Sequence, residues 1–260
     1  MIERCINIDD LVSIITPSYN TAQYIGETIQ CVLNQTYTNW EMIIIDDCST
    51  DDTDKVISSF DDKRIFYFKN EVNSGAAISR NCALLKARGR WIAFLDSDDL
   101  WLPNKLEKQI NFMKKNHYSF SCTYCELIDA SSKDLKKISK SPLHITKTAM
   151  YYYCWPGCLT VMYDVQIIGL IQIENLKRNN DYAMWLKVVK KTDCYCLPEI
   201  LSKYRVRNNS ISHTKLSKLI YSHYILFRKA EKKSPLIALL YTLRNLIFGM
   251  FRKIFYIRKI

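Results

Sequence analysis

The chain of 260 residues is long enough for one large domain or two closely packed halves with a full core. Apolar residues make up 48% and charged residues 24%, as in ordinary folded soluble proteins. The net charge of +11 is uneven: residues 201–260 hold fourteen Lys and Arg and one acid, Glu231, whereas residues 1–200 hold 23 basic and 25 acidic residues. A nucleic-acid enzyme would line its active groove with Lys and Arg, so we expect no nucleic-acid partner.

The N-terminal segment Met1–Asp10 contains three acids and lacks the apolar run of a signal peptide, so we expect a cytosolic, reduced protein. Three close cysteine pairs have spacings that zinc ligands can have: Cys122/Cys125, Cys154/Cys158 and Cys194/Cys196. The first pair falls in a strand-like run, where residues three apart face opposite sides. The four histidines do not cluster with these pairs, and we interpret the cysteines as buried free thiols.

The first hundred residues alternate apolar strand-like runs with amphipathic helical segments. Strands are predicted at residues 11–16, 40–45, 64–68 and 91–95, and a helix between the first two would bury Ile25, Ile29 and Val32. This β-α-β-α-β-α-β order predicts an α/β fold with a mostly parallel sheet covered by helices on both faces. Ligands of such sheets bind beyond the carboxyl ends of the strands.

The next hundred residues continue with a helix at 103–116 and a strand at 118–127. The polar, Lys-rich stretch Ser131–Lys147 is interpreted as a mobile flap. A further helix begins at Asp181 and carries Tyr182, Trp185, Leu186 and Val189 on one face.

Polar residues gather where the predicted strands end, at Thr16–Asn20, Asp46–Thr50, Asn73–Arg80 and Asp96–Asp99. Asp96 and Asp98 lie one residue apart at such an end, and a hard cation takes one or two carboxylates together with phosphate oxygens and waters. We therefore expect a Mg²⁺ or Mn²⁺ site there. The alternative is that Asp98 and Asp99 cap the next helix.

Four motifs in this order resemble the inverting family 2 glycosyltransferases, which share the GT-A type nucleotide-sugar fold, and in particular bacterial enzymes of O-antigen and capsule assembly. They are Ser13-Ile-Ile-Thr-Pro-Ser-Tyr-Asn20, Asp46-Asp-Cys-Ser-Thr-Asp-Asp-Thr53, Asn73-Ser-Gly75 with Arg80-Asn81, and Phe94-Leu-Asp-Ser-Asp-Asp-Leu-Trp101. Weaker matches follow at Asp181-Tyr-Ala-Met-Trp185 and Tyr204-Arg-Val-Arg-Asn-Asn-Ser-Ile-Ser212. Any one motif is a modest signal, but the ordered set is specific.

The resemblance implies a role for each matching residue in nucleotide-sugar binding. Pro17 and Tyr19 would form a wall against the nucleobase, with Thr16 near it. Asp47 would accept a hydrogen bond from the uracil ring or the ribose. Arg80 would lie beside the nucleotide, where its fork suits base or phosphate oxygens.

The resemblance also implies the catalytic groups. Asp98 would be the direct metal ligand, with Asp96 nearer the ribose and also at the metal. Asp181 would be the base that takes the proton of the acceptor hydroxyl as it attacks the anomeric carbon. An Asp before an apolar-periodic helix is also a normal N-cap, and a cap position can itself hold a carboxylate at the rim of a cleft.

Three positions depart from the family pattern. Asn180 stands where an acid usually precedes the base, and Asn208 stands where a Pro is common. Arg207 stands where a His often contacts the diphosphate or the metal, and its charge can still neutralise a leaving diphosphate. We expect retained activity with an altered metal dependence.

The expected enzyme moves a hexose from a UDP-sugar, with inversion, to a carbohydrate acceptor, which we expect to be an oligosaccharide linked to polyprenyl diphosphate in surface-polysaccharide assembly. Residues 1–100 would bind the nucleotide sugar, and residues 101–212 would bind the lipid-linked or free glycan acceptor and supply the base. A sugar-1-phosphate nucleotidyltransferase would carry a Gly-rich, Arg-bearing loop after the first strand, where this chain has Pro17-Ser-Tyr-Asn20. A non-catalytic nucleotide-sugar-binding protein is the second alternative.

Residues 213–260 are predicted to form a basic amphipathic helical tail. One broad apolar stripe is expected, formed by Leu236, Leu239, Leu240, Leu243, Leu246, Ile247, Met250, Ile254 and Ile257. Arg244 and Asn245 interrupt the run too early for a transmembrane helix, which needs about 20 mostly apolar residues. We expect the helix to lie in the plane of an anionic membrane, which would make the protein peripheral on the inner face of the plasma membrane. The alternative is a helix packed on the catalytic body, or a dimer contact.

Overall fold

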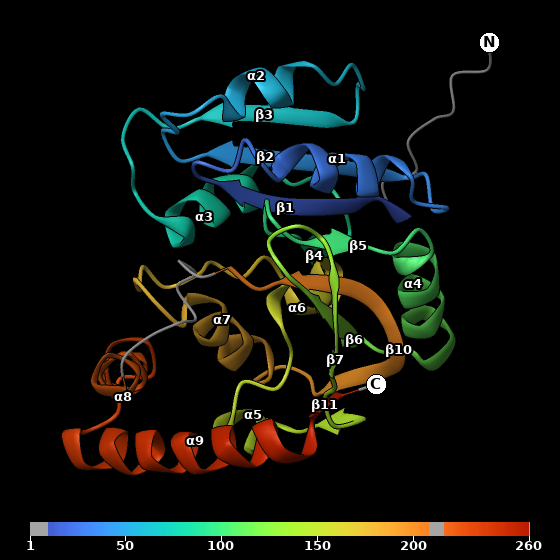
Figure 1. Ribbon diagram of the computed structural model, residues 1–260. Coiled ribbons are helices and arrows are strands. Elements are labelled where there is room, and N and C mark those ends of the chain that lie inside the picture. The colour runs from blue at the N-terminus through green and yellow to red at the C-terminus, as the bar shows by residue number, and fades with distance from the viewer. Residues whose placement is uncertain (1–9, 208–215, 260) are drawn as a thin grey trace.

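The computed structural model describes residues 10–207 and 216–259, and its central feature is one mixed sheet (Figure 1). Four strands form its parallel part in the order β3-β2-β1-β4. They are β1 (Val12–Ser18), β2 (Trp40–Asp46), β3 (Ile65–Lys69) and β4 (Trp91–Phe94). All residues of β1, β2 and β4 are buried, as expected for strands covered on both faces.

Helices cover both faces of this parallel part and divide the core in two. Alternate residues of β1 face opposite ways: Val12 and Ile14 join one cluster, whereas Ile15 joins the other. The first cluster lies under α1 (Ile25–Leu33), α2 (Thr53–Ser58) and α4 (Lys105–Asn116), and the second under α3 (Ala76–Lys86). The predicted β-α-β-α-β-α-β order is confirmed.

The second half of the chain extends the sheet with mainly antiparallel pairs. Here β9 (Met162–Asp164) joins β4 to β6 (Phe120–Ile128), and β6 pairs in parallel with the long strand β10 (Cys194–Arg205). Two short strands, β5 (Leu100–Trp101) and β8 (His144–Ile145), pair with β10. The α/β fold with a central sheet between helices is confirmed, and its parallel pairs concentrate in the first half.

The predicted flap at Ser131–Lys147 is wrong. It contains two strands of the sheet, β7 (Asp134–Ser139), which pairs with β6, and β8. Its many lysines point to solvent from an outer strand, where charged side chains are normal.

Short helices complete the second half and pack on this part of the sheet. They are α5 (Lys147–Tyr152), the 3₁₀ turn η2 (Cys158–Thr160), α6 (Val165–Ile168) and α7 (Asn180–Val188). The nine described cysteines are free thiols, buried or half-buried, and within the described ranges no group of three His, Cys, Asp or Glu side chains is arranged to hold a metal.

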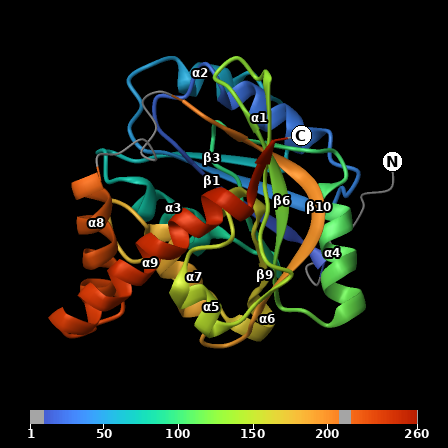
Figure 2. The same ribbon diagram turned by 60° about the horizontal axis from the view of Figure 1, so that its bottom comes forward.

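The last described segment packs against the body through two helices. It comprises α8 (Leu216–Ile225), the π-helical turn η3 (Leu226–Ala230), α9 (Pro235–Phe255) and β11 (Ile257–Lys259), which pairs with β7 (Figure 2). The inner face of α9 is small and polar: Ala238, Thr242 and Asn245 are buried, and Asn245 donates to the backbone oxygen of Tyr151 at 3.1 Å.

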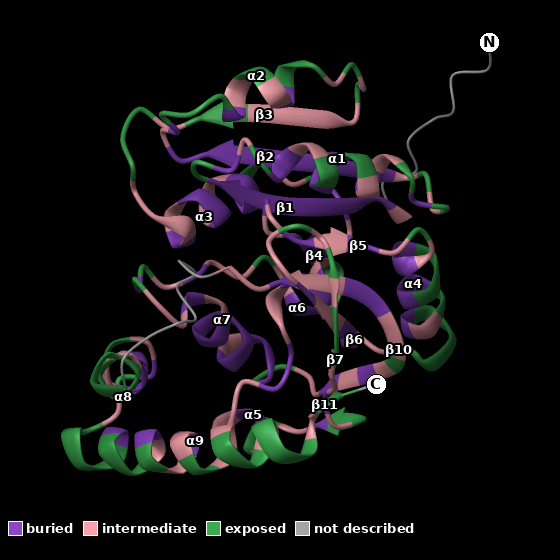
Figure 3. Cartoon of the chain, viewed as in Figure 1, coloured by how far each residue is buried: buried purple, intermediate pink, exposed green. Residues whose placement is uncertain are grey.

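The outer face of α9 carries the apolar residues, so its pattern is inverted relative to an ordinary surface helix (Figure 3). The exposed residues are Leu236, Ile237, Leu239, Leu240, Leu243, Ile247, Met250, Phe251, Ile254 and Phe255. The predicted stripe is therefore present, except that Leu246 is half-buried and Ile257 belongs to β11. No helix in the described residues is long and apolar enough to cross a membrane.

Two sets of predictions fall on residues outside the described ranges. They are the N-terminal segment before Asp10, and the end of the last motif with Asn208 and the boundary at residues 212 and 213. The division into residues 1–100, 101–212 and 213–260 stays a prediction.

Candidate active site

The carboxyl ends of β1, β2 and β3 point to the same side of the molecule, and the polar loops of all four motifs follow them or lie beside them (Figure 1). This is the edge at which parallel α/β sheets bind ligands. The sequence prediction of convergent strand ends is confirmed by the parallel registers of β1 with β2 and β4.

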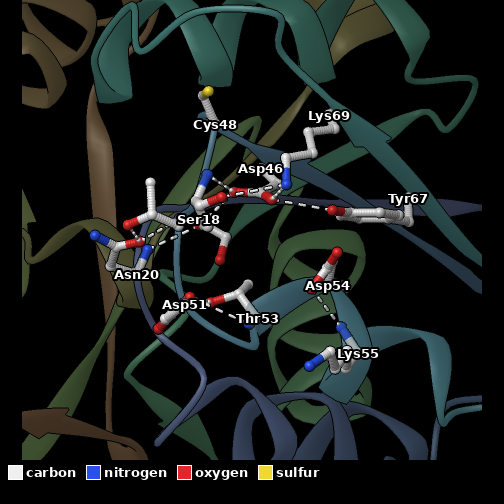
Figure 4. Close-up of polar contacts among 12 residues, drawn as sticks. Ser18, Asn20, Asp46, Cys48, Asp51, Thr53, Asp54, Lys55, Tyr67 and Lys69 are labelled. Atoms are coloured by element: carbon white, nitrogen blue, oxygen red, sulfur yellow. Dashed lines mark hydrogen bonds and ion pairs between the residues drawn. The ribbon is translucent and has the colours of Figure 1, made fainter.

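The loop after β2 is built around the fully buried carboxylate of Asp46 (Figure 4). One of its oxygens accepts hydrogen bonds from the backbone N–H and the hydroxyl of Ser49. The other accepts from the Tyr67 hydroxyl at 3.0 Å and lies 3.7 Å from the Lys69 ammonium. Both oxygens of Asp46 are thus engaged within the protein, and the residue stabilises the loop.

Its neighbour Asp47 holds the loop that leads into α3. The Asp47 carboxylate accepts from the Asn70 amide at 2.8 Å and from the backbone N–H groups of Ser74 at 2.9 Å and Gly75 at 2.7 Å. A carboxylate offers about four acceptor positions, so three are used within the protein. Gly75 has φ of 89°, a conformation that favours glycine. Asp47 therefore positions this loop, and one acceptor position remains for a ligand.

The predicted base-binding residues lie at the end of β1. Thr16 and Pro17 are buried within the strand, and the Thr16 hydroxyl has no hydrogen-bond partner among the described residues. Tyr19 follows the strand and is 48% exposed. The next residue, Asn20, is fastened to the β2 loop by bonds to Ser49 and Thr50. Tyr19 is thus the part of this group that presents a face to a ligand.

Arg80 joins three parts of the site from its place on α3. Its guanidinium donates to Asp96 at 2.5 Å and to the side-chain oxygen of Asn180 at 2.8 Å, and only 6% of the residue is exposed. Asn180 therefore serves as a neutral acceptor in the position where an acid was expected. Burial lowers the Arg80 pKa, but the Asp96 and Asp181 carboxylates, the Cys158 thiol and the hydrogen bond to Asp96 together outweigh it, and the Arg80 pKa is raised.

The loop after β4 also holds Asp98, whose carboxylate forms an ion pair with Arg207. The distance from the Asp98 carboxylate to the guanidinium is 2.6 Å. Burial, opposed by Arg207 but reinforced by Asp96, raises the Asp98 pKa. The alternative that Asp98 and Asp99 cap the next helix is wrong, because Asn104 takes the N-cap position of α4.

A residue that we did not single out from the sequence, Arg205, supports this corner. It is fully buried at the end of β10, its backbone N–H donates to the Asp99 carboxylate at 2.8 Å, and its Nε donates to the backbone oxygen of Asp98 at 2.6 Å. The guanidinium also binds Glu27 at 2.8 Å and Ser132 at 2.7 Å. The motif Tyr204-Arg-Val-Arg207 contains this residue. The sequence does not show which of the two arginines, at alternate strand positions, is buried, because that depends on the orientation of the strand.

Asp181 lies in the first turn of α7, beside the Arg80–Asp96 pair. The N-cap alternative is wrong, because Asn179 occupies that position with a left-handed φ of 56°, and Asp181 accepts from the N–H of Tyr182 at 2.8 Å. Burial raises the Asp181 pKa, and the positive charge of Arg80 opposes the rise. A carboxylate with a raised pKa is a better proton acceptor near neutral pH.

These side chains make one cluster with three carboxylates and two guanidinium groups: Asp96, Asp98, Asp181, Arg80 and Arg207. Burial and mutual repulsion raise the pKa of the carboxyl of the adjoining Asp99 well above its usual value, with Asp98 and Asp96 as the charges responsible. Crowded, partly buried carboxylates of this kind favour a cationic ligand or a proton-transfer role.

Comparison with known proteins shows which proteins the chain is similar to. The family model described as Glycosyl transferase family 2 matches residues 13–162. WfgD of Escherichia coli, named as a UDP-Glc:alpha-D-GlcNAc-diphosphoundecaprenol beta-1,3-glucosyltransferase, is 40% identical over 244 residues, which cover 93% of this chain and 94% of the relative. TuaG of Bacillus subtilis, which carries the name of a teichuronic acid biosynthesis glycosyltransferase, is 43% identical over 229 residues, 87% of this chain and 90% of the relative.

Solved structures share the fold. Residues 1–349 of S. aureus TarS with UDP-GlcNAc match with a TM-score of 0.70 at 19% identity, over 92% of this chain and 73% of the other. The mannosyltransferase PcManGT of Pyrobaculum calidifontis, with GDP-Man and Mn²⁺, matches with a TM-score of 0.65 at 16% identity, over 90% and 68% of the two chains. The GT-A type architecture expected from the motifs is confirmed.

The Asp47 contacts give a first testable prediction. Asp47→Asn replaces an acceptor by an amide that faces three donors, so we expect the free energy of unfolding to fall by about 2 kcal/mol. Hydrogen exchange of residues 70–76 should accelerate as well. Asp52→Asn is the matched control, because Asp52 is exposed in the same loop and pairs only with exposed Lys55, and it should shift stability by less than about 0.5 kcal/mol. Equal denaturation midpoints for Asp47→Asn and the parent would contradict the anchoring role.

Proposed function

Since the chain belongs to glycosyl transferase family 2, we propose that this glycosyltransferase moves a hexose from a UDP-sugar, with inversion, to a carbohydrate acceptor carried on a lipid diphosphate. The observation that carries the proposal is the position of Asp181, half-buried and within electrostatic reach of Arg80 and Asp96. In-line displacement at an anomeric carbon needs a base on the acceptor side and charge neutralisation on the diphosphate side. Asp181 would supply the base, and Arg207, paired with Asp98, would supply the neutralising charge.

Each side chain then has a specific task. Tyr19 offers an exposed ring against which a nucleobase packs, and the loop held by Asp47 lies beside it. Arg80 fixes Asp96 and, through Asn180, the first turn of α7, so that Asp181 keeps its place relative to the donor. Arg207 neutralises the negative charge that develops on the departing UDP.

The residues present fit a divalent metal such as Mn²⁺ or Mg²⁺. Asp98 and Asp96 are hard oxygen donors, both partly exposed, and each is held by a guanidinium group. Two carboxylates suffice for such an ion when phosphate oxygens and waters complete its shell. When bound, the ion would act as a Lewis acid toward the diphosphate. Because Arg207 already pairs with Asp98, we expect a weaker metal dependence than in a site with a neutral residue at position 207.

The acceptor class rests on the relatives. WfgD and WfaP, both of Escherichia coli and both 40% identical to this chain, are named for acceptors linked to diphosphoundecaprenol. We propose the same class of acceptor here, and a place in bacterial surface-polysaccharide assembly on the inner face of the membrane. A sugar-1-phosphate nucleotidyltransferase would release inorganic diphosphate, and a non-catalytic binding protein would release nothing, so the measurement of UDP release with and without acceptor separates the three functions.

Asp181→Asn tests the base. The substitution keeps the size of the side chain and its place in the first turn of α7 but cannot accept the proton, so kcat should fall by on the order of 10²–10⁴. The dissociation constant for UDP-sugar, measured by calorimetry, should stay within a factor of about two to three. Asp193→Asn, a carboxylate beyond the other end of α7 that pairs with His144, should leave kcat unchanged. Full activity of Asp181→Asn, or loss of its fold, would overturn the assignment.

Asp98→Asn tests the metal. It removes one hard ligand and its charge, so turnover that depends on Mn²⁺ or Mg²⁺ should be abolished while circular dichroism remains that of the parent. Binding of Mn²⁺ in the presence of UDP, followed by electron paramagnetic resonance, should weaken in parallel. Near-normal activity of the variant in Mn²⁺ would exclude Asp98 as a ligand.

The inverted pattern of α9 supports a membrane-bound location. The helix uses its small and polar residues to pack on the body and turns at least ten large apolar side chains outward. Two exposed basic residues, Lys253 and Arg258, flank this face, whereas Arg244 turns inward and donates to the backbone oxygen of Tyr151. We propose that the face lies in the interface of an anionic bilayer, with the arginine and lysine heads at the level of the phosphates.

Substitutions on the outer face test this location. Removal of the chain from Ser234 onward would also delete β11 and uncover the inner contacts of α9, so Leu240→Gln with Leu243→Gln and Ile247→Gln is the sharper variant. Affinity for anionic vesicles should fall on the order of 100-fold or more, while soluble acceptor analogues are still glycosylated. The control variant Leu85→Gln, Leu143→Gln, Ile167→Gln changes equally exposed residues elsewhere and should bind as the parent does. Unchanged vesicle binding by the α9 variant would refute the location.

A further inference from the structure

A groove with a mixed aromatic and basic lining runs across the outer part of the sheet, away from the nucleotide loops. It consists of two adjoining hollows of about 380 and about 400 Å³, which share Tyr124 of β6 and Lys140. The first lies along the irregular middle of β10, at Pro198–Leu201, and the second ends on Phe251, Phe255, Tyr256 and Arg258. We call the two hollows together the β6–α9 groove.

Arg252 of α9 lies next to the groove. The guanidinium of Arg252 donates to the Ser139 hydroxyl at 2.6 Å, at the end of β7 next to Lys140, and lies 5.7 Å from the ring of Tyr153.

The distance fits a short oligosaccharide followed by a diphosphate. Ile128 of β6 is in register with Arg205, which binds Asp99 of the carboxylate corner. Tyr124 lies four residues earlier on the same strand, about 13 Å away at the rise of a β-strand. The groove thus lies on the same strand as Ile128, and its distance from the carboxylate corner is greater than the length of one sugar ring.

The charges of the groove suit an anion. Lys140 and Arg258 form no ion pair with a carboxylate in the part of the chain that the structure describes, and the Nε of Arg252 is buried with no hydrogen-bond partner there. Glu199, an acid that lines the first hollow, is already paired with Lys108 at 2.5 Å. Basic side chains that lack acidic partners are the usual complement of a diphosphate.

The apolar lining points to a lipid on the same ligand. Phe251 and Phe255 line the second hollow and are also part of the exposed apolar face of α9. Tyr124 and Tyr256 supply further aromatic surface, and the Lys140 ammonium lies 5.7 Å above the ring of Tyr124. A ligand whose charged head binds Lys140 and Arg258 would leave its apolar tail beside the face that we place in the bilayer.

We infer that the β6–α9 groove binds the diphosphate and first isoprenoid units of the lipid-linked acceptor, with Lys140 and Arg258 on the phosphates and Phe251 and Phe255 on the isoprenoid. This inference rests on the proposed function for the identity of the acceptor. The groove positions the acceptor and takes no part in bond making.

Direct binding tests the groove independently of catalysis. The full chain is saturated with UDP, so that the donor site cannot take up the probe, and farnesyl diphosphate is titrated by calorimetry. Lys140→Gln with Arg258→Gln should weaken binding by on the order of 10- to 100-fold. Lys137→Gln with Lys259→Gln is the matched control, because these exposed lysines are register partners on β7 and β11 and line neither hollow, and it should bind as the parent does.

Two further probes identify what the groove recognises. Farnesol and inorganic diphosphate should each bind at least about 10-fold more weakly than farnesyl diphosphate, because each lacks half of the ligand. Equal binding of farnesyl diphosphate by the parent and by Lys140→Gln/Arg258→Gln, or equal loss in the control, would overturn the inference. Binding of inorganic diphosphate as tight as that of farnesyl diphosphate would also overturn it, since the isoprenoid would then have no site.

Transfer assays separate failure of the groove from failure of the proposed function. With a diphosphate-linked acceptor, Lys140→Gln/Arg258→Gln should raise KM on the order of 10-fold or more, whereas KM for a neutral alkyl glycoside of the same sugar should not change. If the parent transfers to neither acceptor but binds farnesyl diphosphate, the proposed function is wrong while the groove still binds an isoprenoid diphosphate. If KM rises equally for both acceptors, the groove does not bind the diphosphate.

Discussion

The buried guanidinium of Arg205 is the interaction on which the site depends. A charge with no access to solvent is tolerated only when its donors are all engaged, and Arg205 engages four residues from three separate segments: Asp98, Glu27, Ser132 and Ala130. Its own backbone N–H holds Asp99. The end of β10 is thereby locked to the loop after β4, to α1 and to the loop before β7. Loss of any one partner would leave a buried charge incompletely paired, so the corner has one stable arrangement.

Two further ion pairs lie beside the segments that Arg205 holds, and they connect the two halves of the chain. Arg80 ties Asp96 to α7, and Arg207 ties Asp98 to the end of β10. Both carboxylates come from the first half, whereas Asn180 and Arg207 come from the second. The geometry between donor and acceptor therefore depends on the packing of the two halves, which share the second hydrophobic cluster across β4, β9 and β6.

Local patterns predicted the first half of the fold well, because short apolar strands and amphipathic helices alternate there and each strand ends in a polar motif. The second half was harder. β10 carries a bulge between Leu197 and Ser202, which breaks the period of two, and β7 is an outer strand whose lysines resemble a loop. Periodicity has no signal for such strands, because their partners are distant in sequence.

For the site, the paired acids at a strand end indicated Asp96 and Asp98, and the family resemblance implied Asp181 and Arg207, but neither showed what each of them contacts. Asp47 was expected to contact the nucleotide, and the structure gives three of its acceptor positions to Asn70, Ser74 and Gly75. The N-cap interpretations failed because a left-handed Asn179 and an Asn104 begin the two helices. The roles of buried polar groups depend on distances between segments, which a single sequence does not contain.

The outward-facing leucines of α9 also govern how the molecule behaves when nothing covers them. In water, neighbouring molecules would bury these side chains against one another, so dilute buffer favours self-association through α9. Such clusters would hide the entrance of the β6–α9 groove at Phe251 and Phe255 while leaving Tyr19 and the nucleotide loops open. Mild detergent would disperse them. If the β6–α9 groove binds the acceptor as proposed, self-association of the protein and access of that substrate are coupled through a single helix.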